Sequence, residues 1–470
     1  MPLSPLDDRY REKVAELEPV FSEFGLVHAR VRVETEWLIF LSEKKIAPKG
    51  NWASLRKKSK KFSQKDYEAV KKIEQKTNHD VKAVELFLRK QVSKKFWPWI
   101  HFGCTSEDIN NTAYGLMIRE GQTLLTQKLV DVLKDLSKKS RAWKSSAMLA
   151  RTHGQTATPT TMGKEFAVFF HRLKMITGTF RMVPVYGKFS GATGNFAAHS
   201  VAFPKIDWIK YSQEFVEKRL GLTWNPLTTQ IEPHDGQALL LNELSQAGAV
   251  LIDLCRDTWG YISLGYFGQK QKEGEVGSST MPHKVNPIDF ENAEGNFKLA
   301  RGIARTLADE LPISRWQRDL TDSTLQRNLG LVFGHFLLGL KSLEKGLGKL
   351  ELKPKALRDD LKHAPEVLTE AVQTVLRAHG VADAYDQLKK FSRGQALTLE
   401  QIREFIGKTK LPAHTKKELL ALTPGKYTGL SAKLVEKFVR GYGKKKFILS
   451  LSSRLEFAAA NGMERSLALF

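Results

Sequence analysis

The stretch "LLTQKLVDVLKDL", residues 124–136, decides the fold class. Its apolar side chains return every three or four positions, at Leu125, Leu129, Val132, Leu133 and Leu136. This spacing places them along one stripe of an amphipathic helix. We therefore expect a helix here, with its apolar stripe covered by other parts of the protein.

The pattern extends beyond this stretch, and similar patterns follow it along the chain. They cover residues 112–141, 159–184, 236–265, 288–310 and 322–349. Most exceed twenty residues, runs with strand-like alternation are scarce, and no regular repeat is present. The apolar stripes of such long helices must be covered by other helices. This indicates a helical bundle and association between chains. The predicted fold class is all-α, with a long central bundle.

Shorter helices are expected before and after the long ones. We predict an N-terminal helical domain over residues 1–97, a central long-helix bundle domain over 98–347 and a C-terminal helical domain over 348–440. The Gly- and Lys-rich segment "KGLGKLELKPK" marks the second boundary. Residues 441–470 form a basic and apolar extension whose role the sequence does not define, although its apolar spacing indicates an amphipathic helix.

The composition of the chain indicates the cellular compartment of the protein. The chain has 470 residues, 41% of them hydrophobic, which is ample for several domains. It has only two cysteines, Cys104 and Cys255, so a disulfide framework is excluded and a reducing compartment is expected. We see no signal peptide, and the most apolar windows, such as 331–340 and 249–254, are too short to span a membrane. We expect a cytoplasmic protein that does not enter a membrane.

The formal net charge is +23, and much of it is local. Residues 56–95 contain fourteen Lys and Arg against five Asp and Glu. Such a surplus is compatible with nucleic-acid binding or with a solvated basic helix surface of incidental affinity for polyanions. The second interpretation is favoured, because no recognised nucleic-acid motif accompanies the charge.

Several familiar catalytic motifs are absent from the sequence. The "GKT" at 407–409 is not a phosphate-binding P-loop, because Ile402 stands where the first glycine should be. There is no HExxH, no Cys/His cluster with zinc-ligand spacing and no G-x-S-x-G nucleophile elbow. We expect neither a metal nor a cofactor.

Six polar clusters lie at the edges of the helical patterns. They are "TNHDVKAVE" (77–85), "GCTSEDINNT" (103–112), "RTHGQTATPTT" (151–161), "TTQIEPHD" (228–235), "GSSTMPHKVNP" (277–287) and "RWQRDLTDSTLQRN" (315–328). Each has a plain explanation: Thr105 or Ser106 as a helix cap with Glu107 and Asp108 facing the helix dipole, Pro159 as a helix start, or His79 and His153 as buried core histidines. Together they indicate loops that converge on one site.

The content of these clusters indicates a site for an anionic small molecule. The cationic donors are Arg9, Lys284, Arg318 and Arg327. The neutral donors are Asn78, Asn286, Gln230, Thr105 and Ser106. Arginine forks suit carboxylate or phosphate, and the two histidines His79 and His153 are candidates for proton transfer.

The loop "GSSTMPHKVNP" resembles the signature loop of the fumarase/aspartase superfamily, which includes the argininosuccinate and adenylosuccinate lyases. Together, "NHDVKAVE", "CTSEDINN", "RTHGQTATPTT" and "TTQIEPHD" resemble the adenylosuccinate lyases, especially the bacterial ones, and the similarity runs from "DDRY" to about Phe438. The resemblance implies an all-α, three-domain fold. It also implies a homotetramer whose central helices form one large bundle and whose active sites are shared between subunits.

The resemblance also implies an activity. The expected reaction is the β-elimination of fumarate from adenylosuccinate, which gives AMP, and from the succinyl-aminoimidazole-carboxamide ribotide of purine biosynthesis. Ser278, the first serine after Gly277, matches the general base, and His153 matches the general acid. A serine is intrinsically a poor base, so Ser278 needs activation by nearby cations or amide donors.

The remaining roles that the resemblance implies concern substrate binding. Thr105, Ser106, Lys284 and Asn286 hold the succinyl carboxylates, and Gln230 the polar edge of the substrate. Asn78, His79 and Asp80 match the substrate-binding N-H-D, and Thr152 precedes the acid. Arg9, Tyr10, Arg318, Ser323 and Arg327 match positions that bind the nucleotide, chiefly its phosphate.

Two alternatives remain open. The first is another fumarate-releasing lyase of the superfamily, of the argininosuccinate lyase type, whose substrates carry no phosphate. The cations Arg318 and Arg327 argue against it. The second is a polyanion-binding protein on a lyase scaffold, which the net charge of +23 motivates.

Overall fold

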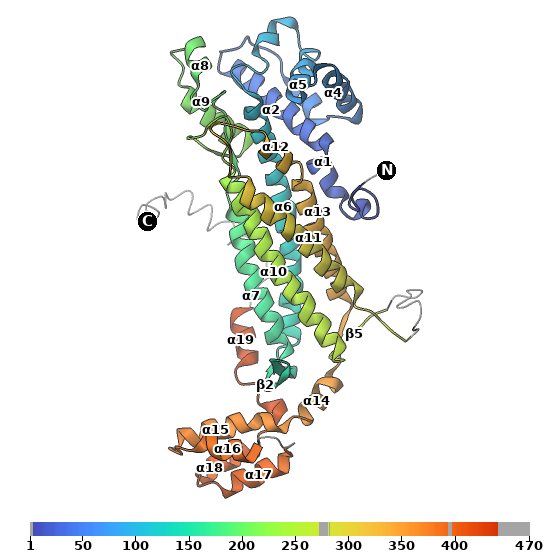
Figure 1. Ribbon diagram of the computed structural model, residues 1–470, viewed down its shortest axis with the longest axis vertical. Helices are drawn as coiled ribbons and strands as arrows, with labels where there is room; N and C mark the ends of the chain where they lie inside the picture. The colour runs from blue at the N-terminus through green and yellow to red at the C-terminus, as the bar shows by residue number, and fades with distance from the viewer. Residues whose placement is uncertain (1–2, 272–280, 282, 393–396, 440–470) are drawn as a thin grey trace. The chain divides into compact units, whose positions relative to one another are not determined.

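The structure is a computed structural model that describes residues 3–271, 281, 283–392 and 397–439. Helices dominate, so the all-α prediction is confirmed (Figure 1). The helices are α1 (Glu18–Phe21), α2 (Glu23–Glu43), α3 (Ala53–Lys60), α4 (Gln64–Thr77), α5 (Asp80–Arg89), α6 (Ser106–Ala142), α7 (Met162–Met182), α8 (Ala197–Ala202), α9 (Trp208–Glu214), α10 (Asp235–Ser263), α11 (Ile288–Glu310), α12 (Thr321–Gln326), α13 (Leu329–Lys349), α14 (Pro354–Lys362), α15 (Thr369–Ala378), α16 (Ala384–Ser392), α17 (Leu399–Lys408), α18 (Ala413–Leu420) and α19 (Ser431–Phe438).

The described strands form three small two-stranded sheets. They are β1 (Ala147–Thr152), β2 (Gln155–Thr161), β3 (Tyr186–Gly187), β4 (Thr223–Trp224), β5 (Phe267–Gln269) and β6 (Leu350–Leu352). β1 pairs antiparallel with β2 and β5 with β6, whereas β3 and β4 are parallel. Short 3₁₀ turns include η1 (Arg11–Lys13) and η5 (Pro365–Leu368).

The long helices follow the apolar spacing closely. The five stripe residues of 124–136 lie within α6, and none is more than 1% exposed. α7, α10 and α11 occupy the predicted patterns to within a few residues. The pattern over 322–349 is divided between α12 and α13, where the Asn328 side chain donates to the carbonyl oxygen of Thr324 (3.0 Å). Such a bond competes with the regular helical ladder.

The prediction for residues 151–161 is wrong. Instead of a loop followed by a helix start at Pro159, the chain forms the β1–β2 hairpin, and α7 begins only at Met162. His153 and Gly154 form its tip with φ of 54° and 75°. Two consecutive positive φ values define a type I′ turn, whose twist matches that of the flanking strands.

Contacts divide the chain into two compact units. The first contains Met1–Leu129, Ile176–Asp253 and Glu291–Leu343, and the second contains Val130–Met175, Leu254–Phe290 and Glu344–Phe470. In the first unit, α4 and α5 pack on α2 around buried residues such as Val31, Val70 and Phe87 (Figure 1). The predicted domain limits at 97, 347 and 440 remain a prediction, and the 441–470 extension lies outside the described residues.

One described helix, α10, is long and apolar enough to cross a membrane by length and composition. It is longer than the apolar windows singled out in the sequence. In its most apolar 18-residue window, 67% of the residues are buried inside the protein, and the core helix of a soluble protein passes the same test.

Candidate active site

The first turn of α6 is held by several hydrogen bonds and a buried ion pair. The backbone N–H of Thr105 donates to the Asp108 carboxylate (2.8 Å), so Asp108 supplies the side-chain cap at the start of α6. Capping by the hydroxyl of Thr105 or Ser106 stays a prediction. The other Asp108 oxygen accepts from the N–H groups of Ser190 and Gly191 and lies 2.8 Å from Nζ of Lys188. Both charged side chains are fully buried. Buried charges require such pairing, and this pair fixes the 188–191 segment against α6.

Glu107, next to Asp108, points to a different partner. It is 1% exposed, and its Oε2 lies 3.1 Å from Nη1 of Arg318, which also donates to Gln230 (3.4 Å). Its second oxygen is buried and accepts no hydrogen bond from the residues that the structure describes. Burial raises the pKa of Glu107 to about 7, although the attraction of Arg318 acts in the opposite direction. This pair thus places a carboxyl group that can hold a proton near pH 7 against the guanidinium of Arg318.

Behind this pair lies a buried polar network centred on His234, which is fully buried. Its Nε2 lies 3.4 Å from Asp322, and its Nδ1 is 3.1 Å from the Gln237 amide. Its backbone N–H donates to Glu232 (3.0 Å). Burial lowers the pKa of His234, but the hydrogen bond to Asp322 and the nearby carboxylates outweigh burial and raise it. The network ties the start of α10 to α12, which carries Ser323.

A second group of ion pairs holds Asp80. Nη2 of Arg30 lies 2.7 Å from Asp80, and Arg30 Nε donates to Asn110 on α6 (2.8 Å). Arg327 reaches the same carboxylate at 3.7 Å and also pairs with Glu23 at 3.1 Å. Burial acts to raise the pKa of Asp80, but Arg30, the Val81 N–H and Arg327 together lower it. Asp80 therefore connects α2 with the Arg327 segment, and Arg30 connects both with α6.

His79 and Asn78 are exposed beside this group. His79 caps α5, with Nδ1 accepting from the backbone N–H of Lys82 (3.2 Å), and Asn78 ends α4 with φ of 50°. His153 is likewise exposed, at the hairpin tip, together with Thr152. The alternative that His79 and His153 are buried core histidines is wrong. Both rings are accessible for proton transfer.

The predicted residues of the signature loop are only partly described. Lys284 is exposed and Asn286 is half-buried, just before α11. The backbone N–H of Lys284 donates to the Met281 carbonyl (3.0 Å), as in a turn. Ser278, Ser279 and Gly277 lie outside the described residues.

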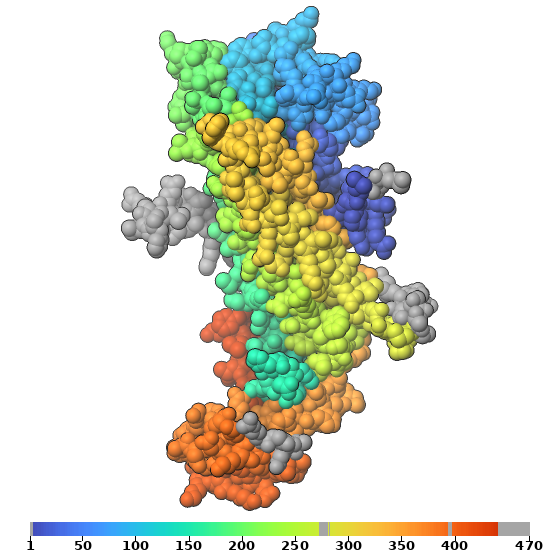
Figure 2. Space-filling model, viewed as in Figure 1, coloured from blue at the N-terminus to red at the C-terminus, as the bar shows by residue number. Residues whose placement is uncertain are grey.

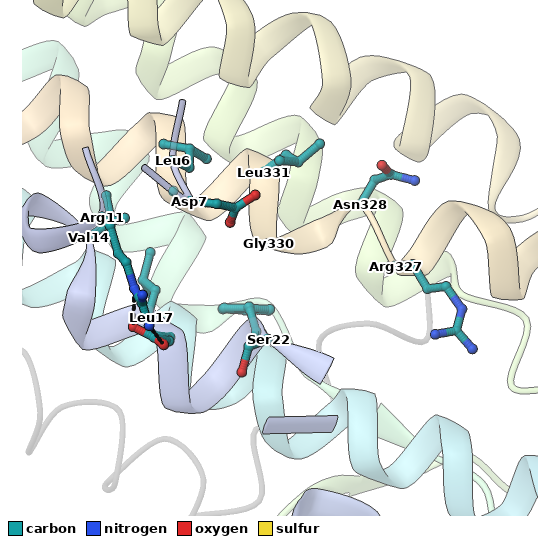
Figure 3. A pocket seen from close by; sticks show the side chains of 13 residues that line it. Leu6, Asp7, Arg11, Val14, Leu17, Ser22, Arg327, Asn328, Gly330 and Leu331 are labelled. Atoms are coloured by element: carbon teal, nitrogen blue, oxygen red, sulfur yellow. Dashed lines mark hydrogen bonds and ion pairs between the residues drawn. The ribbon is translucent and has the colours of Figure 1, made fainter. Parts of the chain in front are cut away.

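Arg327 lines a pocket of about 520 Å³ between the N-terminal segment and the start of α13. Figure 3 shows Arg327 and Asn328 at one end of this pocket and Asp7 and Arg11 at the other. Arg9 and Tyr10 belong to the same N-terminal segment but do not line the pocket. The guanidinium of Arg9 lies 5.7 Å from the Tyr10 ring.

The first unit thus brings together two groups of predicted residues. Arg318 and Gln230 meet the α6 start that carries Thr105 and Ser106, and Asp80 meets Arg327. Thr152, His153, Lys284 and Asn286 belong to the second unit. Sequence reasoning named Glu107 and Asp108 only as acids that face the helix dipole, and it missed the roles of the other partners that hold these groups: Arg30, Lys188, His234 and Asp322. The flanking acids in "SEDINN" and "EPHD" were the available signals.

Among the described residues, no group of three or more His, Cys, Asp or Glu could hold a metal ion.

Known proteins match this chain over nearly its whole length. A family model described as Lyase matches residues 26–302, and one described as Adenylosuccinate lyase C-terminal matches residues 314–428. Adenylosuccinate lyase of Vibrio cholerae is 44% identical over 452 residues, which cover 93% of this chain and 98% of that relative. The chain belongs to the adenylosuccinate lyase family. This confirms the resemblance to the adenylosuccinate lyases that the sequence motifs indicated.

Other adenylosuccinate lyases are similarly close. That of Haemophilus influenzae is 45% identical over 450 residues, and that of Escherichia coli K12 is 44% identical over 449 residues, each covering 98% of the relative. Among solved structures, a fumarate lyase from Mesorhizobium has a TM-score of 0.76 at 21% identity, and it covers 91% of this chain and 98% of its own. A 3-carboxy-cis,cis-muconate lactonizing enzyme from Pseudomonas putida has a TM-score of 0.74 at 20% identity, with 92% of this chain and 98% of its own covered. These two matches show that the fold is shared beyond the adenylosuccinate lyase family.

Proposed function

We propose that the protein is a carbon–nitrogen lyase of purine nucleotide biosynthesis. It releases fumarate from adenylosuccinate to give AMP, and from the succinyl-aminoimidazole-carboxamide ribotide to give the carboxamide ribotide. This proposal rests on one observation: relatives named adenylosuccinate lyase are about 44% identical to this chain over 93% of its length. Arg318 supplies a guanidinium group, which suits a phosphate-bearing substrate.

The reaction requires two proton transfers. A base removes the proton from the carbon beside a succinyl carboxylate, the carbon–nitrogen bond breaks, and the departing nitrogen receives a proton. The aci-carboxylate intermediate is a dianion, and preorganised donors that stabilise it supply a large part of catalysis. Ser278 is the proposed base, with Lys284, Asn286, Thr105 and Ser106 as the donors to the carboxylates.

His153 is the proposed acid. Its ring is exposed at the tip of a hairpin, with the polar side chain of Thr152 beside it, so a substrate can reach it directly. Histidine suits this role because its ordinary pKa lies near neutral pH. Asn78, His79, Asp80 and Gln230 are proposed to bind the substrate, and Arg9, Tyr10, Arg318, Ser323 and Arg327 its nucleotide part.

Arg318 and Arg327 are held differently, which suggests different roles in that binding. Arg318 is tied to the buried Glu107, so its orientation is set before substrate arrives. Arg327 is half-exposed, and its two ion pairs are with the partly exposed Glu23 and Asp80. Preorganised groups bind at a lower entropic cost than groups that must be ordered. Arg318 is therefore the proposed fixed anchor for the phosphate.

The first test is turnover. Purified protein with adenylosuccinate should give AMP and fumarate, whereas argininosuccinate, aspartate and malate should not react. Ser278→Ala and His153→Ala should each lower kcat by orders of magnitude while helical content stays intact. Ser279→Ala is the matched control. An inactivating Ser279→Ala with a mild Ser278→Ala would contradict the assignment of the base.

The proposed assembly is a homotetramer with active sites shared between subunits. In its support, α7 carries exposed apolar side chains at Val168, Met175 and Met182, which are 38%, 62% and 59% exposed. They recur every seven residues, the spacing that a packed neighbouring helix covers. Further exposed apolar residues are Leu239 on α10 and Leu299 on α11. A second copy of the chain is the proposed occupant of these faces.

Shared sites have a specific consequence. If Ser278 and His153 of one site come from different subunits, mixed tetramers of the two inactive variants contain some sites with both residues intact. Co-expression of Ser278→Ala with His153→Ala should then recover activity, up to roughly a quarter of wild type for random mixing. No recovery in mixed tetramers would show that one subunit supplies both residues.

The proposed location is the cytoplasm, in accordance with free Cys104 and Cys255. Affinity for nucleic acid is proposed to be incidental. It should be weak and fall steeply with salt, without effect on turnover at physiological ionic strength. Salt-dependent retention of nucleic acid without lyase turnover would instead favour the polyanion-binding alternative, which the charge of +23 motivates.

A further inference from the structure

The β1–β2 hairpin is anchored on one face by the segment that contains α14, η5 and the start of α15. Arg151 pairs with Thr156 in the register of the two strands, so their side chains leave the same face, and Thr158 follows on it by strand alternation. All three meet acidic residues. Arg151 Nη2 lies 2.7 Å from Asp360, Thr156 donates to Glu366 (3.2 Å), and Thr158 donates to Glu370.

The bond between Arg151 and Asp360 is reinforced by a third side chain. Arg151 Nη1 donates to the hydroxyl oxygen of Tyr266 (2.9 Å), and the Tyr266 hydroxyl donates to the same Asp360 oxygen. Tyr266 is 1% exposed, so its ring fixes the position of the hydroxyl. Burial, together with the Asp360 hydrogen bond, raises the pKa of Tyr266 to about 12. The three groups therefore form a closed triangle at the base of the hairpin.

Apolar contacts support the same face. Leu149, in the middle of β1, is 1% exposed and packs in a small core with Leu361, Ala364 and Val367. In Figure 2 the surface of the hairpin lies directly against that of α14. Directly after Arg151, by contrast, the tip with Thr152, His153 and Gly154 is exposed. The hairpin is thus rigid at its base and open at its tip.

This contact joins segments matched by two different family models. The hairpin lies in the residues matched by the Lyase model, 26–302, whereas Asp360, Glu366 and Glu370 lie in the residues matched by the Adenylosuccinate lyase C-terminal model, 314–428. The hairpin with His153 is therefore held by acids from the residues that the second model matches.

We propose that Asp360, with Tyr266 and Arg151, is a positioning residue for His153. The carboxylate of Asp360 holds the hairpin base, and the hairpin in turn directs its tip histidine at the departing nitrogen of the substrate. This inference rests on the proposed role of His153 as the acid. Misplacement of a catalytic group by about 1 Å costs on the order of 100-fold in rate, so loss of the anchor should act on turnover.

The primary test is Asp360→Asn in the full-length protein. We expect kcat to fall about 10- to 100-fold while KM changes less than about threefold, because substrate contacts remain and only the acid is displaced. The matched control is Asp359→Asn, whose carboxylate is exposed and pairs with Lys355 (2.7 Å), and it should leave both constants unchanged. Hydrogen exchange of residues 147–161 should rise in the first variant and not in the second.

A double variant separates the positioning of His153 from a general structural effect of Asp360→Asn. In a His153→Ala background, measured at high enzyme concentration, Asp360→Asn should cause little further loss, since the group that it positions is gone. The same fractional loss in both backgrounds would overturn the proposal. High turnover of His153→Ala itself would instead refute the proposed acid, which is a distinguishable outcome.

A second pair of variants keeps the test decisive if Asp360→Asn does not fold. Tyr266→Phe removes a single hydroxyl from the triangle and Thr156→Val a single hydroxyl from the bond to Glu366. Each should lower kcat by a smaller factor at unchanged KM, and the two losses should vanish in the His153→Ala background. Unchanged kcat in both folded variants would overturn the proposal.

Discussion

The buried carboxyl of Glu107 should make the stability of the protein depend on pH in a characteristic way. Its pKa is 4.5 in an unfolded chain and about 7 in the folded protein, because burial disfavours the carboxylate. The folded state therefore binds the proton more tightly than the unfolded state. The stabilising contribution is fully present below pH 4.5 and is lost as pH rises through 7.

The magnitude follows from the shift. With 1.36 kcal/mol per pKa unit, the rise from 4.5 to about 7 corresponds to about 3 kcal/mol of unfolding free energy, of which roughly 2–3 kcal/mol falls between pH 5 and pH 8. Glu107→Gln has a similar shape and stays neutral at every pH. The variant should therefore gain stability relative to wild type between pH 5 and pH 8 by this amount.

The assay is urea unfolding, followed by far-ultraviolet circular dichroism at fixed protein concentration, at pH 5 and pH 8. The double difference between the two proteins and the two pH values isolates Glu107, since other titrating groups cancel. Asp319→Asn is the control. Its carboxylate pairs with Arg315 (3.2 Å) on the same segment as Arg318, but its pKa is lowered, chiefly by the Thr321 hydrogen bonds, so it should give no gain at pH 8.

A double difference near zero, or of opposite sign, would refute the reasoning about Glu107. It would show that the ion pair with Arg318 outweighs burial and that the carboxylate is ionised throughout this range. The kinetic consequence can be checked with the same variant, because a neutral amide still accepts from Arg318. Glu107→Gln should therefore weaken substrate binding less than Glu107→Ala does.

Other predictions concern stability. Lys188→Met leaves the buried carboxylate of Asp108 without its cation and should destabilise the protein by about 3–5 kcal/mol, whereas Lys134→Met at an exposed pair should change the urea midpoint little. Gly154→Ala should cost about 1 kcal/mol, because its φ is +75° but its surroundings are open. Gly103→Ala has a similar φ of +72° and would also overlap a histidine ring, so thermal unfolding should show a larger loss for it.

The sequence predicted the long helices well because their signal is local. The stripe of 124–136 needs only its own spacing to define a helix face, and all five of its residues are buried. The hairpin at 147–161 was missed for the opposite reason. The apolar run in β1 covers only the four residues 147–150, and the anchors of the hairpin are remote: Arg151 meets Asp360 across 209 positions of the chain. No local pattern contains that information.

The candidate site was likewise predicted in part. The polar clusters predicted that distant loops meet, and Arg318 with Gln230 does meet the start of α6. What the sequence did not reveal was burial. Glu107 and Asp108 fit a helix dipole equally well whether exposed or buried, and only partners 211 and 80 positions away make them buried charges.

The remote polar partners determine which helix ends and loops lie side by side, and the apolar stripes alone do not determine this. An apolar stripe specifies that a helix is covered, but similar stripes on several helices do not specify which helix end lies beside which loop. The fully buried Asp108–Lys188 pair allows one arrangement of α6 against residues 188–191, because any other leaves a charge unpaired inside the protein. Arg30, bridging Asp80 and Asn110, does the same for α5. Substitution of either buried cation should therefore disturb substrate binding beyond its effect on stability.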